Sequence, residues 1–276
     1  MALRRSYALL REPTVSRASL ALSAVLALTA GPALAGEARC WFENNVIVVG
    51  AEVMGWPGDY ILDTATPHTI LAESQAQTAG YVETALNGEI RLAGLTLPNR
   101  PVQVLAIDLR TGALPTPISG VIGADVLKGF VLDVQFRPCR VTLSPRPRKG
   151  FGPAITLPMD WLADRPVVRA AVSDGPHAFS GAFTPGIGAD TAIRLSDALA
   201  AAPGAPKPKE LYPYGIAFPR LRALSFAGAL SENLPAGLMK AEDPALAGQI
   251  GTQLLSHYRL RFDFPAGKLL LAPVKP

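Results

Sequence analysis

The sequence predicts a mainly β protein made of two similar lobes, and its composition, strand pattern and internal repeat all support this prediction. Of the 276 residues, 26 are proline and 25 are glycine, and long helices are not expected because an interior proline removes a helix hydrogen bond. Short apolar runs with a two-residue period, such as 45–49 and 131–136, alternate with Gly, Pro, Asn or Asp, as in strands joined by hairpins. The helices that the pattern predicts are short, at 124–128, 252–255 and 196–201.

A repeat within the chain indicates an internal duplication. Residues 120–143 and 248–271 align without a gap, and seven of the aligned positions are identical. Such self-similarity over a whole structural unit is the sequence signature of a repeated architecture. A stretch rich in proline, glycine and charge at 144–153 lies between the copies and is typical of a linker. The sequence therefore predicts an N-terminal lobe at 36–148 and a C-terminal lobe at 149–276.

The first 35 residues have the pattern of a secretory signal peptide. Four arginines come before or beside a short apolar run at 20–30, which ends in Ala33-Leu34-Ala35, a small-residue cleavage site. We therefore expect residues 1–35 to be removed on export, which makes the protein periplasmic or secreted. The remaining chain has no apolar run long enough to span a bilayer, so no stable membrane span is expected after removal of the leader.

Removal of this leader leaves a nearly neutral chain. The whole sequence has 26 basic and 22 acidic residues. Subtracting the four Arg and one Glu of the leader leaves 22 basic and 21 acidic residues. A net charge of about +1 predicts no nucleic-acid partner, because such partners are bound by strongly basic surfaces.

The two cysteines, Cys40 and Cys139, are candidates for a disulfide. Export would place them in an oxidising compartment, where a bridge can form and persist; two free buried thiols are the alternative. Two Cys and three His are too few for a Cys/His metal cluster, so no metal site is expected. The chain also has no glycine-rich phosphate loop, and no cofactor is expected.

Two segments of the first lobe resemble the aspartic proteases. The run Tyr60-Ile61-Leu62-Asp63-Thr64-Ala65-Thr66 is similar to the catalytic loop of that family, whose usual form is Asp-Thr-Gly or Asp-Ser-Gly. Gly120-Val121-Ile122-Gly123 resembles the apolar-apolar-Gly stretch beside that loop, and 130–143 resembles the hairpin that closes a lobe. Two such lobes in one chain resemble the pepsin-like arrangement, and the lobe size is closer to the retropepsin-like proteins. The resemblance implies a two-lobed, acid-protease-like β-barrel fold from an internal duplication.

The same resemblance implies roles for the residues of this loop. Asp63 would be the catalytic acid, and the Thr64 hydroxyl would brace the loop across the interface between the lobes. Ala65 and Thr66 would support the loop. Ala65 stands where the family has Gly, and its methyl group matters if the backbone there needs a positive φ or a close approach. His68 could neighbour Asp63 and shift its pKa, or form a simple surface pair.

The second lobe lacks an equivalent acid in the sequence. Aspartic proteolysis needs two carboxylates that share a proton and a water molecule. Alignment of Thr66-Pro67 with Thr184-Pro185 places Gly181 opposite Asp63, and no acid lies between Asp174 and Asp190. We therefore predict a pseudoprotease with an incomplete Asp dyad, which binds an extended peptide or protein segment in the interlobe cleft by strand addition.

Two other interpretations remain open. The chain could be an active aspartic endopeptidase, with the second carboxylate supplied by a homodimer partner or by an unrecognised acid. Alternatively, Asp63 is only a loop acid that accepts backbone N–H bonds, in a scaffold with an unrelated role.

In the resembled family a hairpin called the flap covers the site and carries a Tyr. Here the predicted flap is 84–94 with Asn87-Gly88 as its turn, and the nearest tyrosine is Tyr81.

Overall fold

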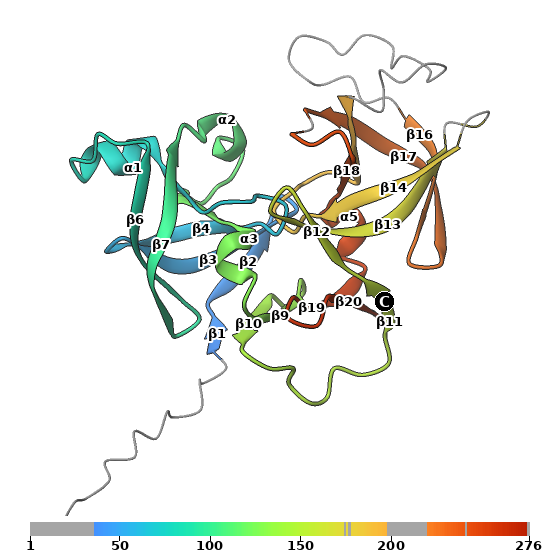
Figure 1. Cartoon of the computed structure of the whole chain (residues 1–276), viewed down its shortest axis with the longest axis horizontal. Coiled ribbons are helices and arrows are strands. Elements are labelled where there is room, and N and C mark those ends of the chain that lie inside the picture. Colours follow the sequence, from blue (N-terminus) through green and yellow to red (C-terminus); the bar gives the residue numbers. More distant parts are fainter. Residues whose placement is uncertain (1–35, 174, 176–177, 198–219, 241, 275–276) are drawn as a thin grey trace, which may run out of the picture. The chain divides into compact units, whose positions relative to one another are not determined.

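The computed structural model describes residues 36–173, 175, 178–197, 220–240 and 242–274 (Figure 1). The signal peptide predicted at 1–35 and most of the helix predicted at 196–201 lie outside these residues. The described chain is mainly β with two barrel-like lobes, so the predicted fold class is confirmed. None of the helices in the described part of the chain is long and apolar enough to cross a membrane.

The first lobe is a seven-stranded sheet in the order β2-β3-β4-β8-β5-β7-β6. It closes into a barrel because β3 pairs with β4 on one side and with β6 on the other. Alternate apolar side chains point inward, and Ile47, Tyr60 and Ile90 are fully buried. The elements of this lobe are β2 (Cys40–Glu43), β3 (Val46–Val53), β4 (Trp56–Leu62), β5 (Ile70–Ala72), α1 (Glu73–Thr78), β6 (Ala85–Leu92), β7 (Leu95–Leu105), α2 (Asp108–Thr111), β8 (Gly120–Ile122) and α3 (Ala124–Leu127).

The second lobe repeats this topology. Its sheet has the order β12-β13-β14-β18-β15-β17-β16, in which each strand takes the place of its counterpart in the first lobe, and it closes through β13 and β16. Phe183, Ile193 and Ile250 are fully buried inside it. Its elements are β12 (Asp160–Leu162), β13 (Arg165–Ser173), β14 (Ala178–Pro185), β15 (Ile193–Ser196), β16 (Arg220–Phe226), β17 (Ala229–Met239), β18 (Leu246–Ile250) and α5 (Thr252–Leu255).

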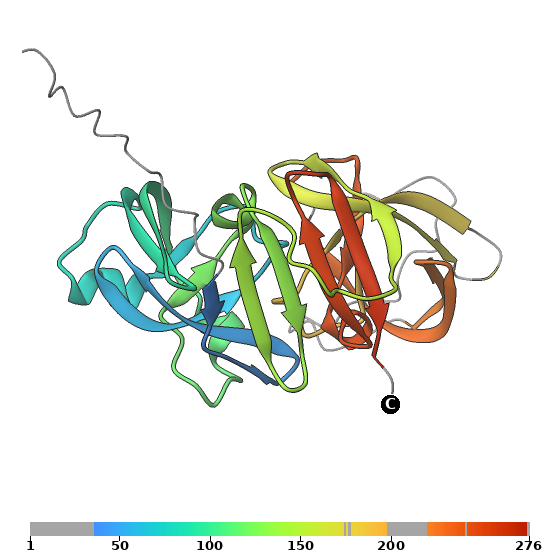
Figure 2. The same ribbon diagram turned by 90° about the horizontal axis from the view of Figure 1, so that it is seen from below.

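A third sheet of six strands joins the two lobes. At its centre β9 of the first lobe pairs with β19 of the second, so the repeated hairpins detected in the sequence meet side by side (Figure 2). One face of this sheet, including Leu132 and Phe262, is buried in the core. The strand order is β1 (Gly36–Ala38), β10 (Arg140–Ser144), β9 (Val131–Gln135), β19 (Tyr258–Asp263), β20 (Lys268–Pro273) and β11 (Ile155–Pro158).

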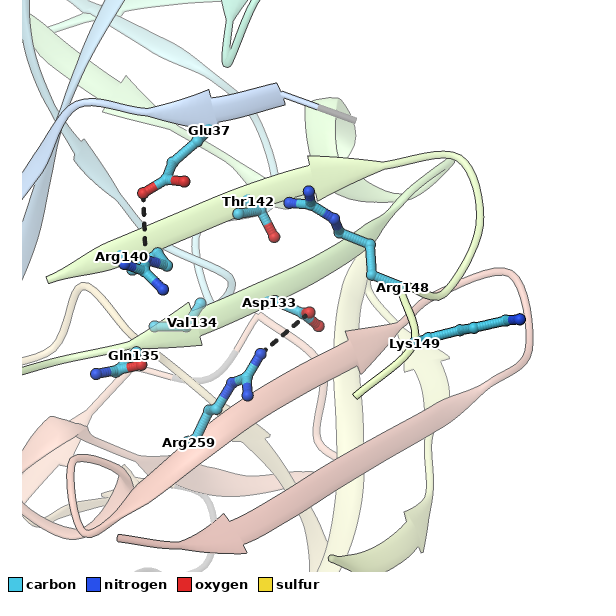
Figure 3. A pocket seen from close by; sticks show the side chains of 9 residues that line it. All are labelled: Glu37, Asp133, Val134, Gln135, Arg140, Thr142, Arg148, Lys149 and Arg259. Carbon is cyan, nitrogen blue, oxygen red and sulfur yellow. Dashed lines mark ion pairs between the residues drawn. The ribbon is translucent and has the colours of Figure 1, made fainter. Parts of the chain in front are cut away.

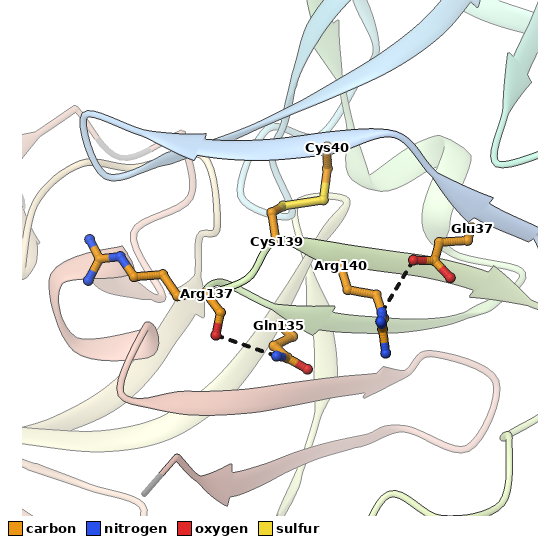
Figure 4. Close-up of a disulfide and its surroundings, with 6 residues drawn as sticks. All are labelled: Glu37, Cys40, Gln135, Arg137, Cys139 and Arg140. Atoms are coloured by element: carbon orange, nitrogen blue, oxygen red, sulfur yellow. Dashed lines mark hydrogen bonds and ion pairs between the residues drawn. A yellow bond between two sulfur atoms is a disulfide. The ribbon is translucent and has the colours of Figure 1, made fainter. Parts of the chain in front are cut away.

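The structure contains a disulfide between Cys40 and Cys139. Cys40 begins β2, and Cys139 lies in the turn between β9 and β10 (Figure 4). The bridge therefore ties an edge strand of the first barrel to the six-stranded sheet, across a sequence separation of 99 residues.

The hairpin of residues 84–94 differs from the prediction. Its turn is Ala93-Gly94, with φ values of 51° and 72°, whereas Asn87 and Gly88 lie inside β6. Gly88 is needed for a close approach rather than a turn, because a Cβ there would lie 2.4 Å from Cγ of Met54. The Ala93 carbonyl packs against Gly36 of β1, where an added Cβ would collide with it. The turn therefore lies beside the six-stranded sheet.

Candidate active site at Asp63

Asp63 lies immediately after β4, in a loop that the first lobe holds in place. The loop is held at both ends, because the Asp63 N–H donates to the Ile122 carbonyl (3.0 Å) and the Ala124 N–H donates to the Thr66 carbonyl (2.8 Å). Strand β8, which ends at Ile122, runs parallel to β4. This is the arrangement that the Gly-Val-Ile-Gly stretch predicted. Asp63 is only 3% exposed.

The Asp63 carboxylate accepts four hydrogen bonds. Its Oδ1 accepts from the N–H groups of Ala65 (3.0 Å) and Gly188 (3.2 Å). Its Oδ2 accepts from the Thr66 hydroxyl (2.7 Å) and from Nη2 of Arg110 (2.5 Å). A carboxylate has about four lone-pair sites, so its capacity to accept further bonds is essentially used. The Thr66 hydroxyl therefore binds the Asp63 carboxylate within the loop.

Arg110 is the residue of this site that sequence reasoning missed. It lies in α2, in the segment between β7 and β8, and pairs with a carboxylate 47 positions away. Its guanidinium also donates to the Thr66 hydroxyl (3.0 Å) and to the Gly188 carbonyl of the second lobe (3.2 Å). No short motif surrounds it, so only the three-dimensional fold reveals the pairing.

The surroundings of Asp63 favour its ionised form. Burial raises the pKa of Asp63, but the charge of Arg110, the Ala65 N–H and the Thr66 hydroxyl together outweigh burial, and the pKa lies below the ordinary 3.8. The carboxylate is therefore charged at neutral and mildly acidic pH. The charge of His68 acts instead on Asp125, where burial raises the pKa of the carboxyl and the hydrogen bonds from Thr69 oppose that rise.

The second lobe carries the same loop, and its backbone contacts identify the counterpart of Asp63. The Gly186 N–H donates to the Ile250 carbonyl (2.8 Å), as the Asp63 N–H does to Ile122, and the Thr252 N–H donates to the Ala189 carbonyl (2.9 Å). The residue equivalent to Asp63 is therefore Gly186. The predicted counterpart, Gly181, was wrong: it lies within β14 and pairs with Ala170.

This error has a simple structural cause. Thr184-Pro185 are the last residues of β14, whereas Thr66-Pro67 follow the loop after β4. Aligning the two Thr-Pro pairs therefore shifted the second loop by five positions. The loop at its corrected position still contains no acid, because Gly186 stands there.

A glutamine fills the space next to Gly186. A Cβ added at Gly186 would lie 2.1 Å from Nε2 of Gln249, and Gln249 is buried with 7% exposure. An amide therefore occupies the place into which a side chain at position 186 would extend. Gly188 is equally constrained, since a Cβ there would lie 2.5 Å from Cβ of Asp63.

Thr64 joins the two loops. Its fully buried hydroxyl donates to the Pro185 carbonyl and accepts from the Ile187 N–H (3.3 Å). The second lobe offers the backbone of Pro185 and Ile187 to this contact and no reciprocal hydroxyl. A second clamp comes from Arg165 of β13, whose Nε donates to the Ala65 carbonyl (2.8 Å). Ala65 does not adopt a positive φ, so the replacement of the family's Gly introduces no backbone strain.

Replacing Thr64 with valine should lower the free energy of unfolding by about 2–6 kcal/mol. The substitution keeps the side-chain shape but leaves a buried carbonyl and a buried N–H without partners, and each such loss costs about 1–3 kcal/mol. Chemical denaturation measures the change. Thr64→Ser restores the hydroxyl and should recover most of the loss, while Thr96→Val, on the exposed side of β7, should have almost no effect. Equal stability of Thr64→Val and the wild type would contradict the bracing role.

A cavity of about 300 Å³ opens beside the Asp63 carboxylate. Its lining includes the polar side chains of Arg110, Arg194 and Gln249 and the apolar side chains of Val46 and Leu114. A second acid, Asp190, also lines the cavity and accepts a hydrogen bond from Arg194 (3.3 Å). The predicted flap does not cover it, because none of residues 84–94 lines the cavity. Within the described residues, no group of three or more His, Cys, Asp or Glu is placed to hold a metal ion.

Comparison with solved structures agrees with the fold. The chain is similar to the aspartic proteinase from Irpex lacteus, with a TM-score of 0.53 and 13% sequence identity, over 88% of this chain and 98% of that chain. No protein-family model matches the sequence, and no curated protein matches it. At this level of identity the similarity shows a pepsin-like, two-lobed fold, and the chemistry has to be argued from the residues of the site.

Proposed function

We propose that this chain is an exported, non-proteolytic protein of the aspartic-protease-like fold that binds an extended peptide or protein segment in the cleft between its lobes. One observation carries the proposal: the Asp63 carboxylate is occupied by its own protein contacts, while glycine and a glutamine amide stand where a second carboxylate would be. The other acid in the lining of the cavity, Asp190, is paired with Arg194. The family's chemistry needs two acids, one protonated and one ionised, that share a proton.

Neither half of that chemistry is available at this site. Asp63 is held in its ionised form by Arg110, and its four acceptor sites are used, so it is both a poor proton donor and a weak base. The Gln249 amide neither gives up nor takes up a proton near neutral pH, so it cannot replace the acid. A water molecule placed between them would therefore lack the acid–base pair that activates it.

The active-dimer alternative fits the contacts less well. Asp63 and Thr64 already bond with Gly188, Pro185 and Ile187 of the same chain. A partner's first lobe would have to displace the second lobe from this interface before its own Asp63 could approach. A dimeric enzyme would therefore need the two lobes to separate first.

Peptide binding is supported by the lining of the cavity. It combines an apolar wall with guanidinium and amide groups, the mixture that fixes a side chain and its flanking backbone. Its volume of about 300 Å³ is at the lower end for ligand pockets and suits one or two side chains of an extended segment. Export is supported by the leader sequence and by the Cys40–Cys139 bridge, since such bridges persist in oxidising compartments.

The test of this proposal is a cleavage assay with a matched variant. Denatured casein is incubated from pH 3 to pH 7 with the wild type or with Asp63→Asn, and both should leave it intact. Pepstatin should not raise the melting temperature. Cleavage that Asp63→Asn abolishes would contradict the proposal, and cleavage that rises more steeply than the protein concentration would support the dimeric enzyme.

Peptide binding is tested separately with variants of residues in the cavity wall. Immobilised wild-type protein should retain members of an unfolded peptide pool, and Leu114→Arg should reduce that retention because its side chain would fill the cavity. Leu105→Arg, a substitution on an exposed leucine outside the cavity, is the matched control. Equal retention by both variants would count against binding at this site.

A further inference from the structure

The outer face of the six-stranded sheet carries a row of polar side chains. Register places Glu37, Thr142, Asp133 and Arg261 next to one another on four adjacent strands, β1, β10, β9 and β19. The opposite face of the same strands is the apolar core. A cavity of about 290 Å³ is lined by Glu37, Thr142 and Asp133 of this row (Figure 3). It is formed by a different part of the molecule from the site at Asp63.

The acids of this cavity are already paired. Asp133 accepts two bonds from the buried Arg261, at 2.5 and 2.7 Å, and Glu37 pairs with Arg140 (3.3 Å). Each acid is therefore neutralised by a neighbouring arginine. The positive charges that remain in the lining belong to Arg148, Lys149 and Arg259.

Arg148 and Arg259 extend over the cavity from two sides, and Lys149 lines its edge with its amine directed outward (Figure 3). Arg148 and Lys149 belong to the linker after β10 and are exposed, and among the described residues neither forms an ion pair. Arg259 lies on β19, 3.8 Å from an Asp133 oxygen that Arg261 already binds. Its guanidinium packs over the Phe151 ring, with 4.8 Å to the ring centre. Phe151 also covers Arg261 (4.5 Å), so the linker is anchored beside the cavity.

Such an arrangement matches a doubly charged oxyanion. Guanidinium groups bind phosphate through paired hydrogen bonds, and lysine adds a point charge. The Thr142 side chain lies in the floor of the cavity and is nearly buried, where its hydroxyl can donate a further bond. Positive charge exceeds negative charge in this cavity, although the chain is almost neutral after removal of the leader. This local excess favours the binding of an anion.

We propose that this cavity binds a phosphate or phosphomonoester group through Arg148 and Arg259, with Lys149 adding positive charge at the edge. The group comes either from a free small molecule or from a lipid headgroup, and both sources present the same chemistry to the cavity. This site is independent of Asp63, so it stands whether or not the protein cleaves peptides.

Calorimetry on the purified protein tests the site directly. The probes are inorganic phosphate and glycerol 3-phosphate, at an ionic strength held constant with sodium chloride. Co-sedimentation with phosphatidylcholine vesicles, with and without phosphatidic acid, tests the lipid source. We expect saturable binding in at least one arm, and the arm that binds identifies the source.

Matched variants decide whether the cavity is responsible. The double variant Arg148→Ala/Lys149→Ala should weaken binding about tenfold or more, the effect of losing one or two charge-assisted hydrogen bonds. Arg259→Gln should weaken it similarly. The control Arg146→Ala/Lys268→Ala removes two exposed charges outside the lining and should leave binding within about twofold. Absence of saturable binding in every arm, or equal weakening by the control, would overturn the proposal.

Discussion

Replacing Arg110 with methionine should lower the free energy of unfolding at pH 7 by about 3 kcal/mol. The substitution keeps the volume of the side chain but leaves the Asp63 carboxylate charged and buried without its cation. Removing one partner of a buried ion pair costs about 3–5 kcal/mol. Arg110 is 33% exposed, so water replaces part of the interaction and we expect the lower end of this range. Chemical denaturation of both proteins measures the difference.

The loss should depend on pH in a defined direction. In the wild type the pKa of Asp63 is lowered, so the stabilisation is complete above the unfolded value of about 3.8 and is lost as the pH falls through the folded value. In Arg110→Met the burial of Asp63 is no longer opposed by the cation, and its pKa should rise. Protonation of Asp63 should then remove the unpaired buried charge. The deficit in the free energy of unfolding of the variant should therefore shrink below about pH 4.

A second substitution controls for packing. Adding Asp63→Asn to Arg110→Met removes the buried charge, so the double variant should be more stable at pH 7 than Arg110→Met alone. A packing defect at Arg110 would not be rescued in this way. A deficit that is the same at pH 7 and pH 3.5, and that Asp63→Asn does not reduce, would contradict the ion-pair explanation.

Removal of the disulfide should have the largest effect on stability. We expect Cys40→Ala/Cys139→Ala to lower the free energy of unfolding by about 4 kcal/mol. The bridge closes a loop across 99 residues, and a loop of about 100 residues restricts the unfolded chain by about 4.7 kcal/mol in the chain-entropy model, of which measured cases usually show 2–4 kcal/mol. Urea denaturation under non-reducing conditions measures the change.

The reduced wild type serves as the control for this prediction. Its unfolding midpoint should fall to that of the double variant, while the double variant itself should be insensitive to reductant. Mass spectrometry should show a gain of two hydrogens on reduction of the wild type and none in Cys139→Ser. A wild type whose stability is unchanged by reductant would show that the bridge is not formed in solution.

The sequence predicted the parts of the fold that repeat or have strong local signals. The match between 120–143 and 248–271 identified the hairpins that meet as β9 and β19, and the short helices at 124–128 and 252–255 appear as α3 and α5. These segments carry dense apolar residues and conformationally required glycines. For example, a Cβ at Gly123 would collide with the backbone of His68.

Weaker signals were misleading in two places. Asn-Gly favours a hairpin turn, but at Asn87-Gly88 the glycine instead admits the Met54 side chain, and the turn formed at Ala93-Gly94. A Thr-Pro pair in each lobe suggested an alignment that the backbone hydrogen bonds correct by five positions. A two-residue motif can recur by chance in a proline-rich chain, so it aligns the two lobes poorly. The backbone hydrogen bonds of the loop are the same in both lobes and align them reliably.

Only part of the site could be predicted from the sequence. Asp63 and Thr64 stand in a recognisable loop, and the absence of an acid near 186 could be read directly. Arg110 and Gln249 could not be found in this way, because each reaches the site from a different segment of the chain. Their roles depend on the close packing of two lobes around Asp63, which no local pattern encodes.

Asp63 is held ionised by Arg110 and is not a member of a proton-sharing pair. An NMR titration of the side-chain carboxyl carbons tests this claim most directly, with Asp63 assigned from the spectrum of Asp63→Asn. We predict one titration step for Asp63, with a midpoint below 3.8 that moves upward in Arg110→Met. A midpoint above 3.8 in the wild type, or two coupled steps shared with a second acid, would contradict the claim.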